Sequence, residues 1–514
     1  MSFVSILGRR DFDNDKEQEF FEQPSYFNDL NLNQIVNRII GLRIDYDLKK
    51  YYYVMPKTVE EICFRQEVLK DFYNEGIMDA TMSFSNGLFR ARNYWGYSVS
   101  AETDIQQKRW KIDSAYAYIN AVREFAASLD GLEVVSEGMK QLKSYLKDMV
   151  ESKEFNEFAD ETVTLMNELF DIEFTLEMER NSITVIPKRN EEHYIEKVAE
   201  MLEIPEGTKV NTYFGSPLTG ALILSGVEEK IINILQKEYP ESFAKIDEYD
   251  DNYSSFIDST LVRLEEEMQF YIAYILFRKE ISQYNFTFCT PEVRDAKDAA
   301  FAIVDGYDLA LARKNSEAGL KTVSNSLDYR DKERFLVITG PNQGGKTTSA
   351  RSMGQIAYFA MLGLDVPAAS VKIPFFHGIM THFEVEESLD TGAGKLKEEL
   401  NRLKPMMEEK GQRNFIVINE LFTTAASYDA YIMGSHVLKH FIELDYFGVY
   451  VTHIKELAKE SETVASLVAG ISELDGKTRT FKIERKASEG IGHASTLVDK
   501  YRLNYDEIKG GLLR

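Results

Sequence analysis

Apolar residues recur every three or four positions through most of the first 180 residues, which is the spacing of one face of a helix. Glycine and proline rarely interrupt this pattern, so it predicts helices over 34–42, 59–73, 104–129, 134–149 and 162–177. A further long helix is predicted over 255–282. Its aromatic residues at helical spacing are more typical of a core than of a surface that stacks on bases: Phe270, Tyr271, Tyr274 and Phe277.

The hydrophobic period shortens to two in the stretch between these helical regions. Short strands are predicted over 183–186, 210–214 and 221–224, with glycine and proline between them. A small mixed module within 181–226 therefore interrupts the helices.

A different alternation begins near residue 320. Apolar runs at 335–339, 414–418 and 449–452 predict buried strands, and a helical pattern covers 347–361. Strands that alternate with helices indicate a parallel sheet covered on both faces. We therefore expect an α+β multidomain protein, helical first and α/β afterwards.

Composition places the chain among ordinary globular proteins. Its 514 residues are 44% hydrophobic and 28% charged, and two cysteines cannot build a disulfide framework or a cysteine zinc site. No signal peptide is recognised, and the longest apolar run, 270–277, is far shorter than a membrane span. We expect a soluble cytoplasmic protein with no membrane association.

Negative charge is concentrated in one part of the chain. Residues 151–267 hold 10 Lys and Arg against 28 Asp and Glu, a net charge of −18, whereas 335–514 hold 21 against 23, a net charge of −2. Phosphate binding rests on Lys and Arg, so the acidic stretch disfavours a simple DNA clamp. It is also what a solvated acidic surface would show.

Residues 340–347 match the phosphate-loop pattern G-x-x-x-x-G-K-[ST] in full, after a predicted strand and before a predicted helix. Such a loop surrounds nucleotide phosphates with backbone N–H groups; Lys346 would reach the β- and γ-phosphates and Thr347 would hold Mg²⁺. A nucleotide and Mg²⁺ are therefore the predicted ligands, and the resemblance described below implies that the nucleotide is ATP. The predicted binding residues are Gly340, Pro341, Asn342, Gly344, Gly345, Lys346, Thr347 and Thr348.

Two later strands also end in polar residues. Asn419 and Glu420 follow the run 415–418, where an acidic pair would face Mg²⁺ and the attacking water. Asn419 can accept a hydrogen bond from a metal-bound water but adds no charge, whereas Glu420 keeps the general-base position. His453 ends the next strand, where it could contact a γ-phosphate. A core strand with a polar end and a structural histidine are the alternatives.

Two further patterns are weaker evidence for a functional site. A glycine turn over 391–395 precedes a helical pattern and could bind an anion, although a plain capped helix explains it as well. His436 and His440 are spaced to bind a metal from one helix face, but no third ligand is evident.

Taken together, these motifs resemble the MutS family of ATPases. Residues 338–347 are similar to that family's ITGPNxGGK[ST] loop, 363–368 to its G-x-x-V-P-A segment, and 418–420 with 427–429 to its I-D-E and [ST]-Y-D-G elements. Thr452 and His453 match its T-H pair, and 323–325 its F-V-x-N segment. The resemblance is weaker over 25–320.

The resemblance implies a domain order and an assembly. It implies a helical core or lever domain over 1–180, a clamp-like insertion over 181–250, returning lever helices over 251–320 and an ATPase domain of the ABC type over 321–514. It also implies a homodimer with two composite ATP sites. Each site would pair Lys346, Glu420 and His453 with the 392–395 turn of the other subunit.

Several departures from the family pattern limit the functional expectation. Asn419 replaces the usual Asp, Gly394 the usual Ser, and Ala430 the usual Gly. The resemblance starts at the family's core region, so we expect no mismatch-reading or connector domain. The leading hypothesis is an ATP-driven switch that acts on DNA, in a repair or recombination role. The alternatives are an ATP-gated clamp on a protein or ribonucleoprotein and a scaffold that binds ATP without hydrolysis.

Overall fold

The computed structural model describes residues 5–8, 22–179, 182–187, 224, 226–295, 300–384, 394–409, 411–472 and 478–487. The strand predicted over 210–214 and nearly all of that over 221–224 lie outside these residues. By internal contacts the chain forms two compact units. The first comprises 1–4, 74–134 and 139–265, and the second comprises 5–73, 135–138 and 266–514.

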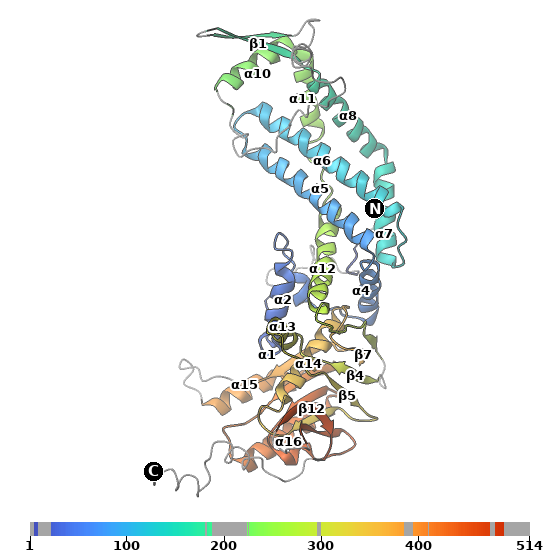
Figure 1. Cartoon of the computed structure of the whole chain (residues 1–514), viewed down its shortest axis with the longest axis vertical. Coiled ribbons are helices and arrows are strands. Elements are labelled where there is room, and N and C mark those ends of the chain that lie inside the picture. The colour runs from blue at the N-terminus through green and yellow to red at the C-terminus, as the bar shows by residue number, and fades with distance from the viewer. Residues whose placement is uncertain are drawn as a thin grey trace. The chain divides into compact units, whose positions relative to one another are not determined.

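A pair of long antiparallel helices, α5 (Glu75–Ser100) and α6 (Asp104–Asp130), forms the main part of the first unit (Figure 1). Phe84 and Phe125 stack between them with ring centroids 4.3 Å apart. Gly87 allows the close approach, since a Cβ there would lie 2.5 Å from the Cβ of Ala121. The other elements of this unit are α7 (Glu137–Glu151), α8 (Lys153–Phe170), β1 (Phe174–Glu179), β2 (Ser182–Pro187), α10 (Gly226–Glu238) and α11 (Pro240–Asn252).

One sequence prediction for this unit needs correction, and three of its helices were not predicted. The helix predicted over 162–177 ends at Phe170, and β1 then pairs antiparallel with β2, for example Leu176 with Val185. Leu, Glu and Met favour helices, so they concealed the two-residue alternation of β1. Helix α5 was not predicted, because its three glycines and its serines weaken local propensity; packing against α6 supplies its stability. Helices α10 and α11 were not predicted either.

The second unit contains a six-stranded sheet in the order β12-β11-β6-β10-β9-β8. Five strands run parallel, and β12 is antiparallel to β11, which corrects the expectation of a wholly parallel sheet. The strand bounds are β6 (Phe335–Thr339), β8 (Gly378–His382), β9 (Asn414–Asn419), β10 (Phe447–Val451), β11 (Val464–Ile471) and β12 (Arg479–Arg485). The predictions for β6, β9 and β10 are confirmed to within about two residues at each end.

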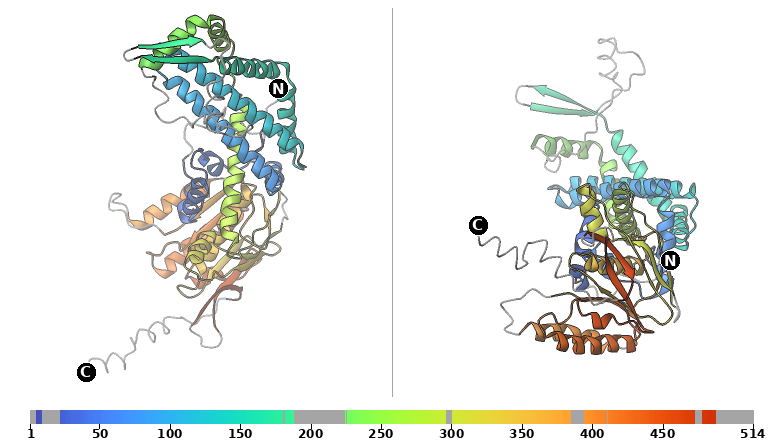
Figure 2. Two further views of the ribbon diagram at one scale, coloured as in Figure 1. Left: turned by 45° about the horizontal axis from the view of Figure 1, so that its top comes forward. Right: turned by 60° about the horizontal axis from the view of Figure 1, so that its bottom comes forward.

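Helices cover both faces of this sheet (Figure 2). Helix α16 (Ser427–Glu443) packs on one face, where Phe441 stacks over Phe335 with centroids 6.5 Å apart. Helix α14 (Lys346–Met361) packs against β9 and β10 outside that cluster and is buried along nearly its whole length. The buried strand runs therefore have the environment that their composition predicted. The unit also contains α13 (Leu309–Glu317), α15 (Lys395–Glu408) and a 3₁₀ turn (Lys455–Ala458).

A second sheet of the same unit, in the order β3-β7-β4-β5, lies beside α14 in the fold. Its strands are β3 (Glu292–Arg294), β4 (Phe301–Gly306), β5 (Asn325–Tyr329) and β7 (Ser370–Pro374). The residues around the start of β5 lie near the start of α14, because Val323 and Thr348 line the same cavity.

The N-terminal residues of this unit complete the packing around α14. They form α1 (Tyr26–Asp29), α2 (Leu32–Gly41), α3 (Lys49–Tyr53) and α4 (Val59–Asp71). Gln355 Nε2 donates to the Leu30 carbonyl at 2.8 Å, and Tyr358 Oη donates to the Tyr52 carbonyl at 2.6 Å. Gly354 leaves room for Leu30, because a Cβ would lie 2.6 Å from that leucine's Cδ2.

Helix α12 (Ser259–Ser282) carries the aromatic residues predicted to lie in the core. All four are fully buried, and within the second unit Tyr271 Oη donates to the Ile6 carbonyl at 2.7 Å. The core interpretation of this stripe is confirmed, and stacking on bases is excluded for it.

Candidate nucleotide site

The glycine-rich loop joins β6 to α14, as the motif requires. Gly340 has a φ of +122°, and a Cβ there would lie 3.0 Å from the backbone N of Ala469 on β11. At Gly344 a Cβ would lie 2.9 Å from the Ala469 side chain. Only glycine fits at Gly340, where the backbone is left-handed and another chain segment is close.

Lys346 is the first residue of α14 and is 5% exposed. Its Nζ donates to the carbonyl oxygens of Gly340 at 3.0 Å and Pro341 at 3.2 Å, across the mouth of the loop. Burial lowers the pKa of Lys346 from its ordinary value; the Glu420 carboxylate opposes that shift, and the positive charge of Arg479 adds to it. If a nucleotide bound in the loop, its phosphate oxygens could take the place of these two carbonyl oxygens as partners of the ammonium group.

Thr347 and Asn419 are directly hydrogen-bonded. The Thr347 hydroxyl donates to Asn419 Oδ1 at 2.8 Å, which joins the start of α14 to the end of β9. These two oxygens belong to the residues predicted to hold Mg²⁺, and oxygen ligands are what that ion requires. The donor set therefore fits a magnesium site, with an amide oxygen in place of a carboxylate.

Glu420 lies one residue beyond β9 with a φ of +57°, and its backbone N–H donates to the Val451 carbonyl. Its Oε1 accepts a hydrogen bond from His453 Nε2 at 2.9 Å. That hydrogen bond lowers the pKa of the Glu420 carboxyl despite burial, and the positive charges of His453 and Lys346 lower it further. A carboxylate that stays ionised beside the phosphate loop is suited to accept a proton or orient water.

On its other side, the loop borders a cavity of about 330 Å³. Tyr307 lines it from the residue after β4, and Val323 and Asn325 line it from around the start of β5. Thr348 lines it from α14 and Phe481 from β12. An aromatic side chain with nearby polar groups suits a nucleoside.

A bulge in the β11–β12 hairpin aims Phe481 at this cavity. The register changes between Ala469 and Ile471, and Phe481 has a φ of +57°. Asn325 fixes the bulge on both sides: its Nδ2 donates to the Phe481 carbonyl at 3.1 Å, and its Oδ1 accepts from the Ile483 N–H at 2.8 Å. Bulges commonly re-aim a side chain in this way.

The structure thus brings together most of the residues predicted for the site. Lys346, Thr347, Asn419, Glu420 and His453 surround one end of the loop, and Thr348 lines the cavity. The glycine turn behaves differently: 391–393 lie outside the described residues, and Gly394 is the N-cap residue of α15. Sequence reasoning missed Phe481 and Tyr307, because no local motif marks either residue.

The family comparison agrees with this geometry. Residues 336–500 match the family model for MutS domain V. Over this stretch, about a third of its length, the chain is similar to MutS domain V. The matched stretch covers β6, the loop, α14, β9, β10 and the hairpin, which together hold the candidate site.

Curated relatives match over limited stretches. The DNA mismatch repair protein MutS of Fervidobacterium nodosum is 26% identical over 181 residues, which is 34% of this chain and 21% of that protein. The DNA mismatch repair protein msh-2 of Neurospora crassa is 30% identical over 129 residues, 25% of this chain and 14% of that protein. The DNA mismatch repair protein MSH3 of Candida glabrata is 22% identical over 314 residues, 57% of this chain and 29% of that protein. The chain therefore matches less than a third of the length of each.

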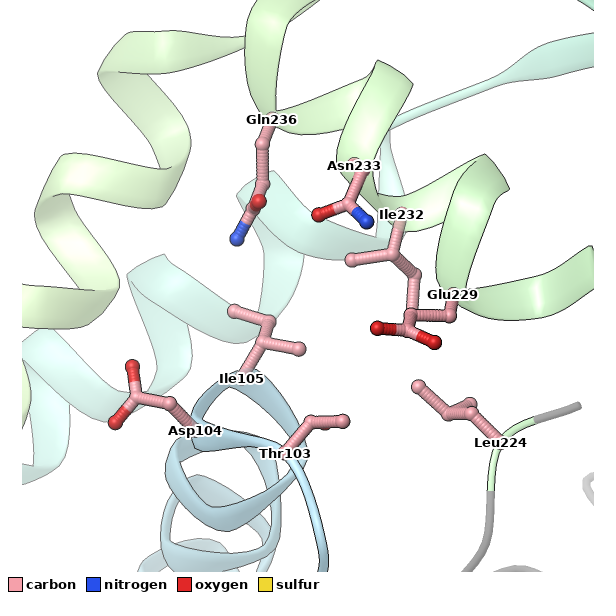
Figure 3. Close-up of a pocket in the computed structure, with 8 residues that line it drawn as sticks. All are labelled: Thr103, Asp104, Ile105, Leu224, Glu229, Ile232, Asn233 and Gln236. Atoms are coloured by element: carbon pink, nitrogen blue, oxygen red, sulfur yellow. The ribbon is translucent and has the colours of Figure 1, made fainter. Parts of the chain in front are cut away.

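Other candidate features have simpler explanations. His436 Nδ1 contacts the Ile432 carbonyl at 2.8 Å and His440 Nε2 the Met407 carbonyl at 2.9 Å, so both rings have backbone partners. A hollow of about 180 Å³ in the first unit is lined by aliphatic, amide and acidic side chains, among them Asp104 and Glu229 (Figure 3).

Within the part of the chain that the structure describes, no helix is long and apolar enough to cross a membrane.

Proposed function

We propose that this chain is a MutS-like ATPase that works as a homodimer, in which binding and hydrolysis of MgATP drive a conformational switch acting on DNA. One observation carries the proposal: a complete phosphate loop places buried Lys346 and the Thr347–Asn419 pair beside the Glu420–His453 pair. A nucleoside-sized cavity borders the same loop. The domain order and the 392–395 turn as a partner-facing element remain parts of this proposal.

Each group has a chemical role in the proposed reaction. Lys346 and the loop N–H groups stabilise negative charge on the phosphates. Mg²⁺, when bound by Thr347 and Asn419, neutralises phosphate charge. Glu420 orients a water toward the γ-phosphate and accepts its proton, and His453 holds that carboxylate in place. Phe481 and Asn325 position the nucleoside end of the substrate.

A second function, an ATP-gated clamp on a protein partner, is favoured by the surface of the first unit. Residues 151–267 carry a net charge of −18, from 10 basic and 28 acidic residues. Large apolar side chains are also exposed there, with Phe170 69%, Phe174 38% and Leu176 41% exposed. Acidic surface repels DNA, whereas apolar side chains among acids suit a basic protein partner.

Steady-state ATP hydrolysis tests the proposed function. Lys346→Ala should reduce turnover by about 100-fold or more, because it removes the cation that binds the phosphates. Lys332→Ala is the matched control, since that lysine is 74% exposed and pairs with Glu462 at the surface. Unchanged turnover in Lys346→Ala would overturn the site assignment.

Duplex and branched DNA in the same assay separate the two candidates. Stimulation by DNA that weakens steeply with salt supports the DNA-acting switch, because phosphate contacts release counterions. Measurable turnover that is indifferent to DNA supports the clamp on a protein partner. Bound ATP without turnover would instead indicate a scaffold.

A further inference from the structure

Arg479 stands at the edge of the phosphate loop, where the hairpin forms one of the walls of the loop. It is the first residue of β12 and pairs with Ile471 in the register of β11. Two residues away on each strand, Ala469 would touch a Cβ at Gly340, and Phe481 would touch one at Gly345. Arg479 therefore continues the wall that already contacts the loop at two points.

Among the described residues, the buried Nη1 atom of Arg479 has no hydrogen-bond partner. The other arginines described between 300 and 487 each contact a carboxylate or a backbone carbonyl. They are Arg313, Arg330, Arg334, Arg351, Arg402, Arg413 and Arg485. A buried hydrogen-bond donor without a partner destabilises a fold. The unpartnered donor of Arg479 therefore suggests that a bound ligand supplies its acceptor.

The charge of the site indicates what that acceptor is. Arg479 lies close enough to Lys346 for its charge to act on the lysine. Lys346 and Arg479 are therefore two neighbouring cations, and the Glu420 carboxylate beside the loop is hydrogen-bonded to His453. An anion with several oxygens would balance this pair of cations, and a planar guanidinium matches phosphate oxygens well.

We propose that Arg479 is a second phosphate-binding cation of this site and donates to the phosphate chain that Lys346 also binds. The inference rests on the proposed function, because it requires that a nucleotide occupies the loop. It assigns to the β11–β12 hairpin two roles, nucleoside contact through Phe481 and phosphate contact through Arg479.

Binding of a fluorescent ATP analogue, followed by anisotropy and competed with ATP or with inorganic tripolyphosphate, tests this role. Arg479→Ala should weaken ATP and tripolyphosphate binding by about tenfold or more each, as expected for a lost charge-assisted hydrogen bond. Tripolyphosphate has no nucleoside, so a hairpin merely deformed around Phe481 would weaken ATP and leave tripolyphosphate unchanged.

Matched variants make the result decisive. Arg479→Lys should recover part of the lost affinity, and Arg330→Ala, which removes a surface arginine paired with Asp328, should bind like the parent chain. If Arg479→Ala does not fold, Arg479→Gln takes its place. Parent-like tripolyphosphate binding by the arginine variant overturns the inference. If Lys346→Ala binds ATP normally, the proposed nucleotide site itself is wrong.

Discussion

The two sides of the phosphate loop are built in different ways. On the side of the proposed metal ligands, Asn419, Glu420 and His453 lie at or within two residues of the ends of buried strands. Hydrogen bonds of 2.8 and 2.9 Å pair Asn419 with Thr347 and Glu420 with His453. On the hairpin side, Phe481 reaches its place through a register change and a positive φ. The metal side is therefore fixed by parallel strand ends, whereas the hairpin side depends on a bulge that Asn325 holds.

This difference suggests that the two sides of the loop have separate roles, one in the reaction and the other in binding the nucleotide. In the proposed reaction, strand ends place the groups that would act on the terminal phosphate, since neighbouring parallel strands end at the same edge of a sheet. A bulged edge strand is freer to change its side chains, and here it supplies the groups that would select the nucleotide. Variants on the two sides should thus separate turnover from affinity.

The largest effect is expected on the metal side. Glu420→Gln should lower ATP turnover by about 100-fold or more while ATP binding stays close to normal, because the amide cannot accept the proton of the attacking water. Single-turnover hydrolysis and equilibrium binding, measured on one preparation, check both parts. Equal loss of binding and turnover would contradict the division between the two sides.

An intermediate effect is expected on the hairpin side. Phe481→Ala should weaken ATP binding by about tenfold with a smaller change in the rate at saturating ATP, since an aromatic ring stacked on a base contributes about 1–3 kcal/mol. Phe481→Tyr keeps the ring and should bind ATP like the parent chain. Titration of ATP against turnover gives both parameters, and parent-like affinity in Phe481→Ala would show that the cavity does not hold the nucleoside.

The smallest effect is expected from restoring a charge on the metal side. Asn419→Asp should lower the Mg²⁺ concentration needed for half-maximal turnover by a few-fold, because a carboxylate attracts the ion more strongly than an amide. The Thr347 hydroxyl can donate to either oxygen, so the local structure should persist. An unchanged or raised Mg²⁺ requirement would argue against a role for Asn419 beside the metal.

The sequence predicted the residues at the strand ends, but little of the hairpin side of the loop. The strands ending at Thr339, Asn419 and Val451 were found because buried parallel strands form continuous apolar runs. The register change of β12 has no local signature, and Phe481 and Arg479 became candidates only when the fold placed them beside Gly340 and Gly345. The 391–395 turn lies largely outside the described residues, and its role remains a prediction.

Other parts of the fold show the same limit. The four aromatic residues of α12 were assigned to the core from helical spacing alone, and all are buried. Helix α5 was missed because packing, rather than local propensity, stabilises it, and β1 was concealed by residues that favour helices.

The packing of Leu30 and Tyr52 on α14 has a practical meaning for dividing this protein into fragments. Leu30 sits in the space left by Gly354, and its carbonyl accepts from Gln355, while the Tyr52 carbonyl accepts from Tyr358. A fragment cut at residue 321 would keep every phosphate-loop residue and yet expose the helix that follows the loop. The smallest fragment that keeps α14 covered therefore combines residues near the N-terminus with the phosphate-loop region, although these segments lie about 300 residues apart in the sequence.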